Sequence, residues 1–217
     1  MAQPALESVR RSLASAAADS ARTDLALTLA TLIERLEERE HEAARHARDV
    51  AALAVEIAER IGLSVDETQQ IRLGALLHDI GKLAVPDEIL SKPGPLTERE
   101  WTLMRAHPSA GEAVLEPILE RNGGAATACA RAVLMIVRWH HERWDGDGYP
   151  DRLAADEIPV GARIVAVADA FQAMVERRPY RDARSREDAM AEVVREAGRQ
   201  FDPATVDSLL AVAAGRR

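Results

Sequence analysis

Leucines in the first part of the chain recur with the period of a helix. Leu25, Leu29, Leu32 and Leu36 follow one another at steps of four, three and four residues, which places them on one face of a helix. A stripe of two heptads fits either docking on the parent domain or pairing with a second copy of the chain. We expect pairing, in a homodimer through this N-terminal helix.

The helical pattern continues beyond this stripe. It runs without a breaker to Ile61 and ends at Gly62, a residue type that favours the left-handed cap of a helix. Ser64 with Glu67 then has the spacing of a capping box, which opens the next helix. The sequence therefore predicts one long helix up to Ile61 and a second helix directly after it.

Residues 160–178 combine strand-type residues with a helical period. Ile164, Val165 and Val167 are β-branched, as in a buried strand, but Ile164, Val167 and Phe171 lie three and four residues apart along one helical face. The spacing of three and four residues predicts a helix. With 47% hydrophobic and only 3% aromatic residues, the composition also favours close-packed helices over sheets.

We therefore predict an all-α protein in two parts. The first part, residues 1–35, is a leader with the amphipathic helix, and residues 36–217 form the main domain. The formal net charge of −8 argues against a nucleic-acid-binding protein, since phosphate contacts need clustered cations. The single Cys129 fits a reducing compartment. We recognise neither a membrane span nor a signal peptide and expect a cytoplasmic protein.

Histidines and aspartates lie beside apolar helical runs in several parts of the chain. Each of the six histidines fits an ordinary buried or surface role when taken alone, but together with Asp79 and Asp169 they form a candidate ligand set. Nitrogen and carboxylate ligands suit iron, manganese or zinc. Because neighbouring helical side chains diverge by about 100°, His78 and Asp79 converge only if the carboxylate bridges two metals. Such a centre suits phosphodiester hydrolysis.

A histidine pair followed by a glycine-rich turn is the most distinctive stretch. His140 and His141 carry ring nitrogens that need partners once buried. Gly146 and Gly148 then let the chain turn sharply, before Pro150 stiffens its exit. A histidine-rich surface turn is the alternative to a binding site here.

Four separated segments together resemble the HD-GYP family of metal-dependent phosphohydrolases. The spacing matches over about residues 40–210. The resemblance implies an HD-type helical bundle that hydrolyses cyclic di-GMP to pGpG, GMP or both, through a hydroxide bridging the metals. The segments are His78-Asp79-Ile80-Gly81-Lys82, His107 with Gly111, His140 to Pro150, and Arg163 to Arg181.

The resemblance implies a set of metal ligands, all present in this chain. Glu42 stands four residues before His46, on the same helix face, and is implied to bind a third metal; the alternative is one more solvated charge in an acidic run. We expect two or three divalent ions, iron or manganese, with zinc also compatible. The other implied ligands are His46, His78, Asp79, His107, His140, His141 and Asp169.

The resemblance also implies catalytic and substrate-binding groups. Lys82, one of two lysines in the chain, is expected to contact the scissile phosphate and to act with Asp79. Arg178 and Arg181 are expected to bind phosphate oxygens, unless they are ordinary surface arginines. Tyr149 is expected to line the guanine or ribose side of the pocket.

The turn around Tyr149 has a second interpretation. In Gly148-Tyr149-Pro150, the family resemblance also implies a surface that recognises a diguanylate cyclase (GGDEF) partner. Cyclic di-GMP as substrate and this partner are both compatible with the sequence.

The chain departs from the family pattern at Gln172, where a second aspartate is usual. Glutamine can donate or accept a hydrogen bond but carries no charge, so we expect reduced activity. This leaves two alternatives to a competent cyclic di-GMP phosphodiesterase. One is a signalling module that binds cyclic di-GMP or a cyclase with little turnover, and the other is a hydrolase for another nucleotide.

Overall fold

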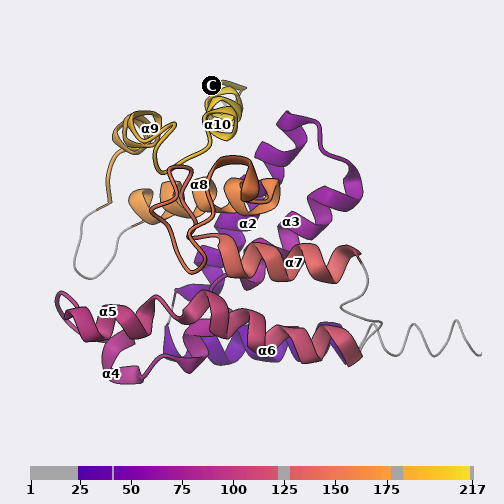
Figure 1. The fold of residues 1–217 in the computed structure, drawn as a ribbon, viewed down its shortest axis with the longest axis vertical. Helices are drawn as coiled ribbons and strands as arrows, with labels where there is room; N and C mark the ends of the chain where they lie inside the picture. The colour runs from indigo at the N-terminus through magenta and orange to yellow at the C-terminus, as the bar shows by residue number, and fades with distance from the viewer. Residues whose placement is uncertain (1–23, 41, 122–127, 177–182, 216–217) are drawn as a thin grey trace, which may run out of the picture.

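Helices account for all the regular secondary structure in the residues that the computed structural model describes, 24–40, 42–121, 128–176 and 183–215 (Figure 1). Among these residues, extended pairing is limited to one isolated bridge, Ala197 with Phe201. The all-α prediction is confirmed. None of the described helices combines the length and hydropathy needed to cross a membrane.

The larger of two apolar clusters forms the centre of the bundle. Val50, Ile57, Ile164 and Phe171 are buried in it, and each removes its whole side chain from water, which contributes roughly 1.5–3 kcal/mol per residue. The contributing helices are α2 (Ala43–Ile61), α3 (Val65–Leu77), α7 (Ala128–Trp139), α8 (Val160–Val175), α9 (Arg186–Arg195) and α10 (Pro203–Gly215).

The second apolar cluster lies where α6 (His107–Arg121) and α7 (Ala128–Trp139) meet a helix over residues 24–39. Leu29 and Leu36 of this N-terminal helix are only 7% and 6% exposed and pack in the cluster with residues of α6 and α7. The leucine stripe therefore docks on its own domain. A dimer through these leucines would have to displace them from this cluster, and the oligomeric state stays a prediction, as does the boundary after residue 35.

The single long helix predicted up to Ile61 is wrong. The described chain leaves helical geometry at residue 40 and α2 begins at Ala43. The two helices bury their apolar faces in different clusters, and one straight helix cannot serve both. At the break, Arg39 donates to the carbonyl oxygens of Lys82, Leu83 and Val85, and thereby holds the short helix η1 (Ile80–Ala84).

Other local predictions are confirmed. Gly62 caps α2 in the left-handed region, with φ of 91°. Ser64 and Glu67 form both hydrogen bonds of a capping box. Residues 160–175 are the helix α8, as the period indicated.

Two glycines set the distance between η1 and α6. A Cβ atom on Gly81 would overlap the carbonyl oxygen of His107 and the backbone nitrogen of Gly111. Only a residue without a side chain fits this contact. Because Asp79 precedes η1 and His107 begins α6, the contact brings their two side chains together. In Figure 1, α4 (Asp87–Leu90), α5 (Glu98–Met104) and α6 lie at the bottom of the view, and α9 and α10 lie at the top.

Candidate metal centre

Seven of the eight predicted ligands, all except Glu42, occupy helix ends or single helical turns that face one another. His78 follows the last turn of α3, His107 begins α6 and His140 follows α7. His46 lies in the first turn of α2, and Asp169 lies on the facing side of α8. The apolar runs before the histidines anchor the helices, so that each helix delivers a polar group into the centre.

These side chains form two groups, and each group places its ligand atoms within 4.8 Å of one another. We call His46, His78 and Asp79 the carboxylate half and His107, His140 and His141 the imidazole half. Asp79 joins them: its Oδ2 lies 3.4 Å from Nε2 of His78 and its Oδ1 lies 3.3 Å from Nε2 of His107. One carboxylate therefore faces both halves, as predicted from the His-Asp pair.

Asp169 completes the carboxylate half from α8. Its Oδ1 lies 2.9 Å from Nε2 of His46 and 4.0 Å from Nε2 of His78. With it, all seven predicted side chains come together, although they are spread over more than a hundred residues of sequence. Their assignment as metal ligands stays a prediction.

Backbone carbonyls orient three of the rings. The Nδ1 atoms of His78, His107 and His140 each donate to the carbonyl oxygen three residues earlier, at 2.7, 2.8 and 2.9 Å. A carbonyl can only accept, so the proton of each neutral ring is on Nδ1 and the lone pair on Nε2 faces the centre. This is the ring orientation that metal-binding histidines use.

Two observations on these Nε2 atoms indicate that the centre is suited to metal ions. The Nε2 atoms of His107 and His140 lie 3.4 Å apart, and two lone pairs that face each other at this distance repel unless a cation lies beside them. In addition, Nε2 of His78 is buried and has no hydrogen-bond partner among the described residues, which is costly for a polar atom. A divalent cation in each half would provide a partner for all three Nε2 atoms.

Electrostatics differ between the halves. Burial alone would lower the pKa of His46, but hydrogen bonds from its ring to Asp169 and Glu176 outweigh burial and raise the pKa to about 10. Burial would raise the pKa of Asp79, but the charges of Lys82 and His78 hold it well below its ordinary value.

In the imidazole half, burial dominates. It lowers the pKa of His141 to about 4, with a further contribution from His107, and it lowers the pKa of His140 well below its ordinary value. Burial lowers the pKa of His107 as well. These three rings are therefore neutral at pH 7 and available as ligands.

Lys82 lies beside the carboxylate half. Its Nζ is 2.9 Å from Oδ2 of Asp79 and 3.3 Å from Oε2 of Glu40. Burial would lower the pKa of the ammonium, but Asp79 and Glu40 raise it above its ordinary value. Lys82 is thus a fixed cation at the edge of the centre, next to the bridging carboxylate.

Two other predicted residues, Glu42 and Gln172, lie outside the two ligand groups. Glu42 is exposed and pairs with Arg45 at 2.9 Å, outside both ligand groups, so its role at a third metal stays a prediction. Gln172 turns its amide to the carbonyl oxygen of Asp49, at 3.2 Å. Arg178 and Arg181 lie outside the described residues.

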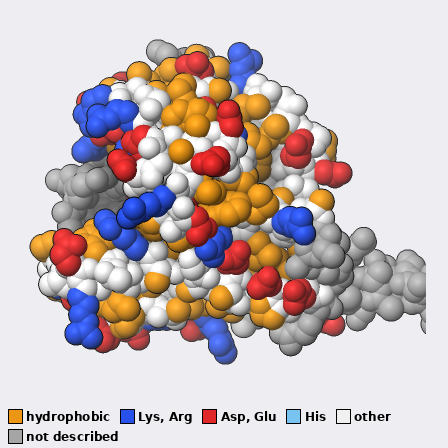
Figure 2. Space-filling view, in the orientation of Figure 1, with side chains coloured by type: hydrophobic (Ala, Val, Ile, Leu, Met, Phe, Trp, Pro, Cys, Tyr) orange, Lys and Arg blue, Asp and Glu red, His pale blue; other side chains and the backbone are white. Residues whose placement is uncertain are grey.

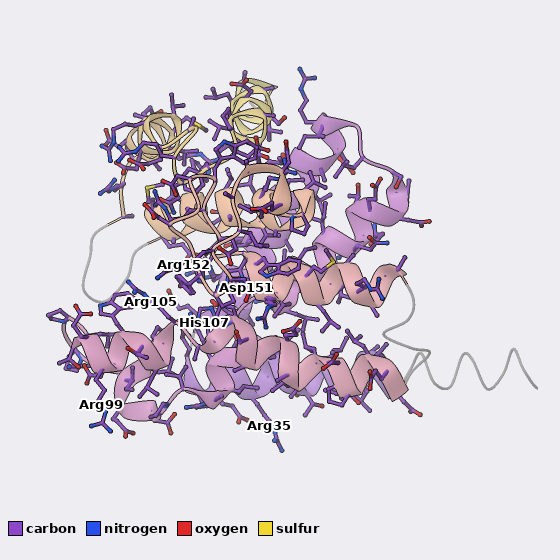
Figure 3. The ribbon with its side chains drawn as sticks, viewed as in Figure 1. Arg35, Arg99, Arg105, His107, Asp151 and Arg152 are labelled. Carbon is purple, nitrogen blue, oxygen red and sulfur yellow. The ribbon has the colours of Figure 1, made fainter. Side chains whose placement is uncertain are left out.

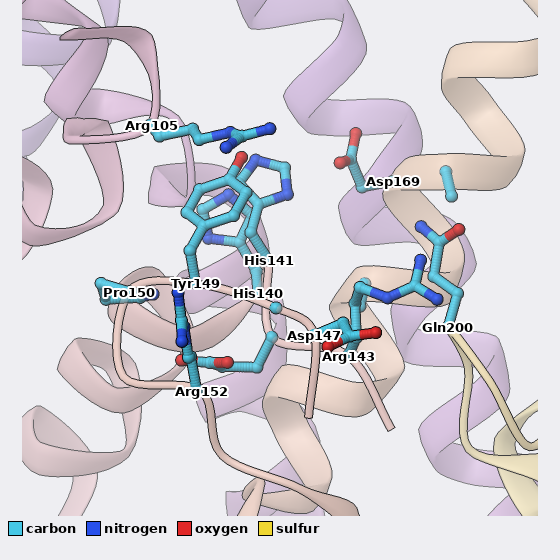
Figure 4. Close-up of a pocket in the computed structure, with 14 residues that line it drawn as sticks. Arg105, His140, His141, Arg143, Asp147, Tyr149, Pro150, Arg152, Asp169 and Gln200 are labelled. Carbon is cyan, nitrogen blue, oxygen red and sulfur yellow. The ribbon is translucent and has the colours of Figure 1, made fainter. Parts of the chain in front are cut away.

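A cavity of about 600 Å³ opens over the imidazole half, within the roughly 300–1,000 Å³ of typical small-molecule sites. His141 and Asp169 line it, and the ring of Tyr149 stacks on that of His141 with centroids 4.9 Å apart. Arg105, from the end of α5 (Glu98–Met104), reaches over the same tyrosine ring (Figure 4).

The sequence did not single out the arginines of this cavity. Arg105, Arg143 and Arg152 line it, and Figure 3 shows Arg105 and Arg152 approaching from different segments. Arg143 is paired with Asp145, whereas Arg105 is exposed and contacts aromatic rings. On the face shown in Figure 2, basic and acidic side chains are interspersed. In a chain rich in arginine, no spacing distinguishes these cations from the surface ones.

Glu176, at the end of α8, was also missed. Its Oε2 lies 3.0 Å from Nδ1 of His46. Glu176 follows Gln172 by four residues, about one helical turn, but this spacing alone does not single it out among the glutamates of the chain.

Known proteins share this sequence pattern. The chain matches the HD domain family over residues 30–205. It is 41% identical to the cyclic di-GMP phosphodiesterase response regulator RpfG of Xanthomonas campestris pv. campestris, over 84% of this chain and 47% of RpfG. It is 38% identical to the 3'3'-cGAMP-specific phosphodiesterase 2 of Vibrio cholerae, over 82% of this chain and 33% of that protein. The chain thus spans half or less of these curated relatives.

Solved structures agree on the fold. The HDG"Y"P protein Bd1817 from Bdellovibrio bacteriovorus superimposes with a TM-score of 0.61 at 20% sequence identity, over 80% of this chain and 53% of Bd1817. At this identity the likeness concerns the fold alone.

Proposed function

The chain belongs to the HD domain family, with the HD-GYP motifs its sequence indicated, and on that premise we propose that it hydrolyses a phosphodiester bond of cyclic di-GMP. One observation carries the proposal: Asp79 faces both ligand halves next to a cavity large enough for a small-molecule substrate. The curated relatives act on two different cyclic dinucleotides, which supports this substrate class.

The residues that would hold two divalent ions are His46, His78, Asp79 and Asp169 on one side and His107, His140 and His141 on the other. Such ions would supply a water molecule of lowered pKa and offset charge on the phosphoryl oxygens. The buried, mostly nitrogenous ligand set suits iron or manganese, with zinc compatible.

The chain's own groups then bind and orient the substrate. Lys82, next to Asp79, is placed to contact a phosphate oxygen at the edge of the centre. The stacked rings of His141 and Tyr149 offer an apolar wall for a base, and Arg105 above Tyr149 offers a guanidinium for a phosphate or a base edge. Tyr149 thus faces the substrate cavity, which favours its substrate role over recognition of a cyclase partner.

A third ion at Glu42 is a separate proposal. Its carboxylate would have to leave Arg45 and turn toward His46, one helical turn away. Metal counting on the wild type and on Glu42→Ala tests this, and equal numbers of ions per chain would contradict it.

A substrate panel tests the main proposal. Protein purified without oxygen and loaded with Fe²⁺ or Mn²⁺ is incubated with cyclic di-GMP, 3'3'-cGAMP and cyclic di-AMP, and products are separated by chromatography. We expect cyclic di-GMP to give pGpG, GMP or both at the highest rate. Tight binding without product would support the signalling module instead, and faster turnover of another nucleotide would reassign the substrate.

A further inference from the structure

His46 differs from the other oriented histidines in what holds its ring. His78, His107 and His140 use backbone carbonyls of their own chain segment. The Nδ1 of His46 instead meets the carboxylate of Glu176, 130 residues away in sequence, at 3.0 Å. On its Nδ1 side, the ring is therefore held by a side chain and not by the backbone.

The environment of Glu176 makes this contact specific. The side chains of Glu176 and His46 are only 8% and 9% exposed, and a buried carboxylate is costly unless it is paired and hydrogen-bonded. The second oxygen of Glu176, Oε1, lies 3.3 Å from a guanidinium nitrogen of Arg45. Arg45 and His46 are neighbours on α2, so Glu176 clamps the first turn of this helix to the end of α8.

The same face of α8 offers a second candidate for this role, and the structure rejects it. Gln172 lies one turn before Glu176, but its amide donates to a backbone carbonyl of α2, that of Asp49. At this end of α8, Glu176 therefore supplies the carboxylate that contacts His46.

We infer that Glu176 is a positioning residue of the metal centre: it holds the His46 ring through Nδ1, so that Nε2 faces the carboxylate half. Carboxylates that accept from the outer nitrogen of a metal-binding histidine fix the ring and increase its basicity as a ligand. The inference rests on the proposed metal centre and is independent of which nucleotide the protein hydrolyses.

Metal titration tests the inference without an activity assay. Mn²⁺ is added to chelator-treated protein, and the free ion is counted by electron paramagnetic resonance. Glu176→Gln keeps the size of the side chain and removes its charge. We expect one of the bound ions to be held about 10- to 100-fold more weakly. The matched control is Glu192→Gln, on α9, where the glutamate pairs with arginines away from the centre.

The outcomes separate the inference from the proposed function. If the wild type binds no ion, the metal centre itself is wrong. If it binds two ions and Glu176→Gln binds both with unchanged affinity, the centre stands and the positioning role is wrong.

A measurement on the wild type covers the case in which Glu176→Gln does not fold. With Zn²⁺ bound, nitrogen NMR of the His46 ring should show a protonated Nδ1 and an unprotonated Nε2. The opposite assignment would overturn the inference.

Discussion

The two halves of the centre hold the same kind of ring in opposite electrostatic environments. In the carboxylate half, Asp169 and Glu176 bracket His46 and raise its pKa to about 10. In the imidazole half, burial among other rings lowers the pKa of His141 to about 4. The difference arises from the neighbours, because carboxylates contact the ring of His46 whereas other imidazole rings lie against that of His141.

The two halves therefore differ as binding sites, although histidine is the main ligand type in both. The imidazole half presents neutral rings to a cation, and two of its side chains, those of His140 and His141, line the cavity. The carboxylate half offers negative charge, but His46 must lose a proton before its Nε2 can bind. Asp79 faces both halves, and we propose that it couples them.

The largest effect is expected from removing that shared group. Asp79→Ala should abolish hydrolysis, with a loss of about a thousandfold or more, since both halves lose a ligand. Product formation from cyclic di-GMP measures it, with Asp207→Ala, an exposed aspartate on α10, as the control. Substantial remaining turnover would show that the halves work without a shared carboxylate.

The next effect separates the halves from each other. His141→Ala and His46→Ala should each lower the bound metal by about one ion per chain, because each removes one ligand of a single half. Metal analysis by mass spectrometry measures this. Loss of both ions in either variant would show that the two halves bind metal as one unit.

After metal removal with a chelator, the two halves should change the free energy of unfolding in opposite directions of pH, with an acid limb from the imidazole half and an alkaline limb from the carboxylate half. Below about pH 6.5, an unfolded His141 takes up a proton that the folded one does not accept until about pH 4, so stability falls as pH falls. For His46 the folded form keeps its proton up to about pH 10, so its contribution is complete below pH 6.5 and is lost as pH rises toward 10.

Urea unfolding across this pH range measures the two limbs, each of the order of 1–3 kcal/mol. His141→Gln should reduce the slope of the acid limb, to which His107 and His140 also contribute, and His46→Gln should reduce that of the alkaline limb. If either substitution flattens both limbs, the halves do not titrate separately.

The smallest effect is expected at the position that departs from the family pattern. Because Gln172 faces α2 backbone, Gln172→Asp should change the rate by less than about threefold, below the ~10- to 100-fold typical of residues that contact metal ligands. Steady-state rates with cyclic di-GMP test it. A larger gain would support the reduced activity expected from the sequence.

Sequence reasoning captured the groups that lie at helix ends. Helical periods and caps predicted the fold class, and the resemblance to the HD-GYP family implied the seven side chains that come together. The break after Arg39 and the contact of Glu176 depend on how distant helices pack, and neither leaves a local signal strong enough to read. Arg105 was missed for another reason, since one exposed arginine resembles the many others in this chain.

The backbone carbonyls that accept hydrogen bonds from His78, His107 and His140 affect how the protein tolerates amino-acid substitutions. They belong to Ala75, Met104 and Val137, and a carbonyl is the same whichever side chain follows it. Substitutions at these positions that preserve the helices leave the rings aligned. Three of the four acceptors that orient these histidines are therefore insensitive to the identity of the side chain. The fourth acceptor is the side chain of Glu176, so one substitution at this position removes it and changes the surroundings of His46.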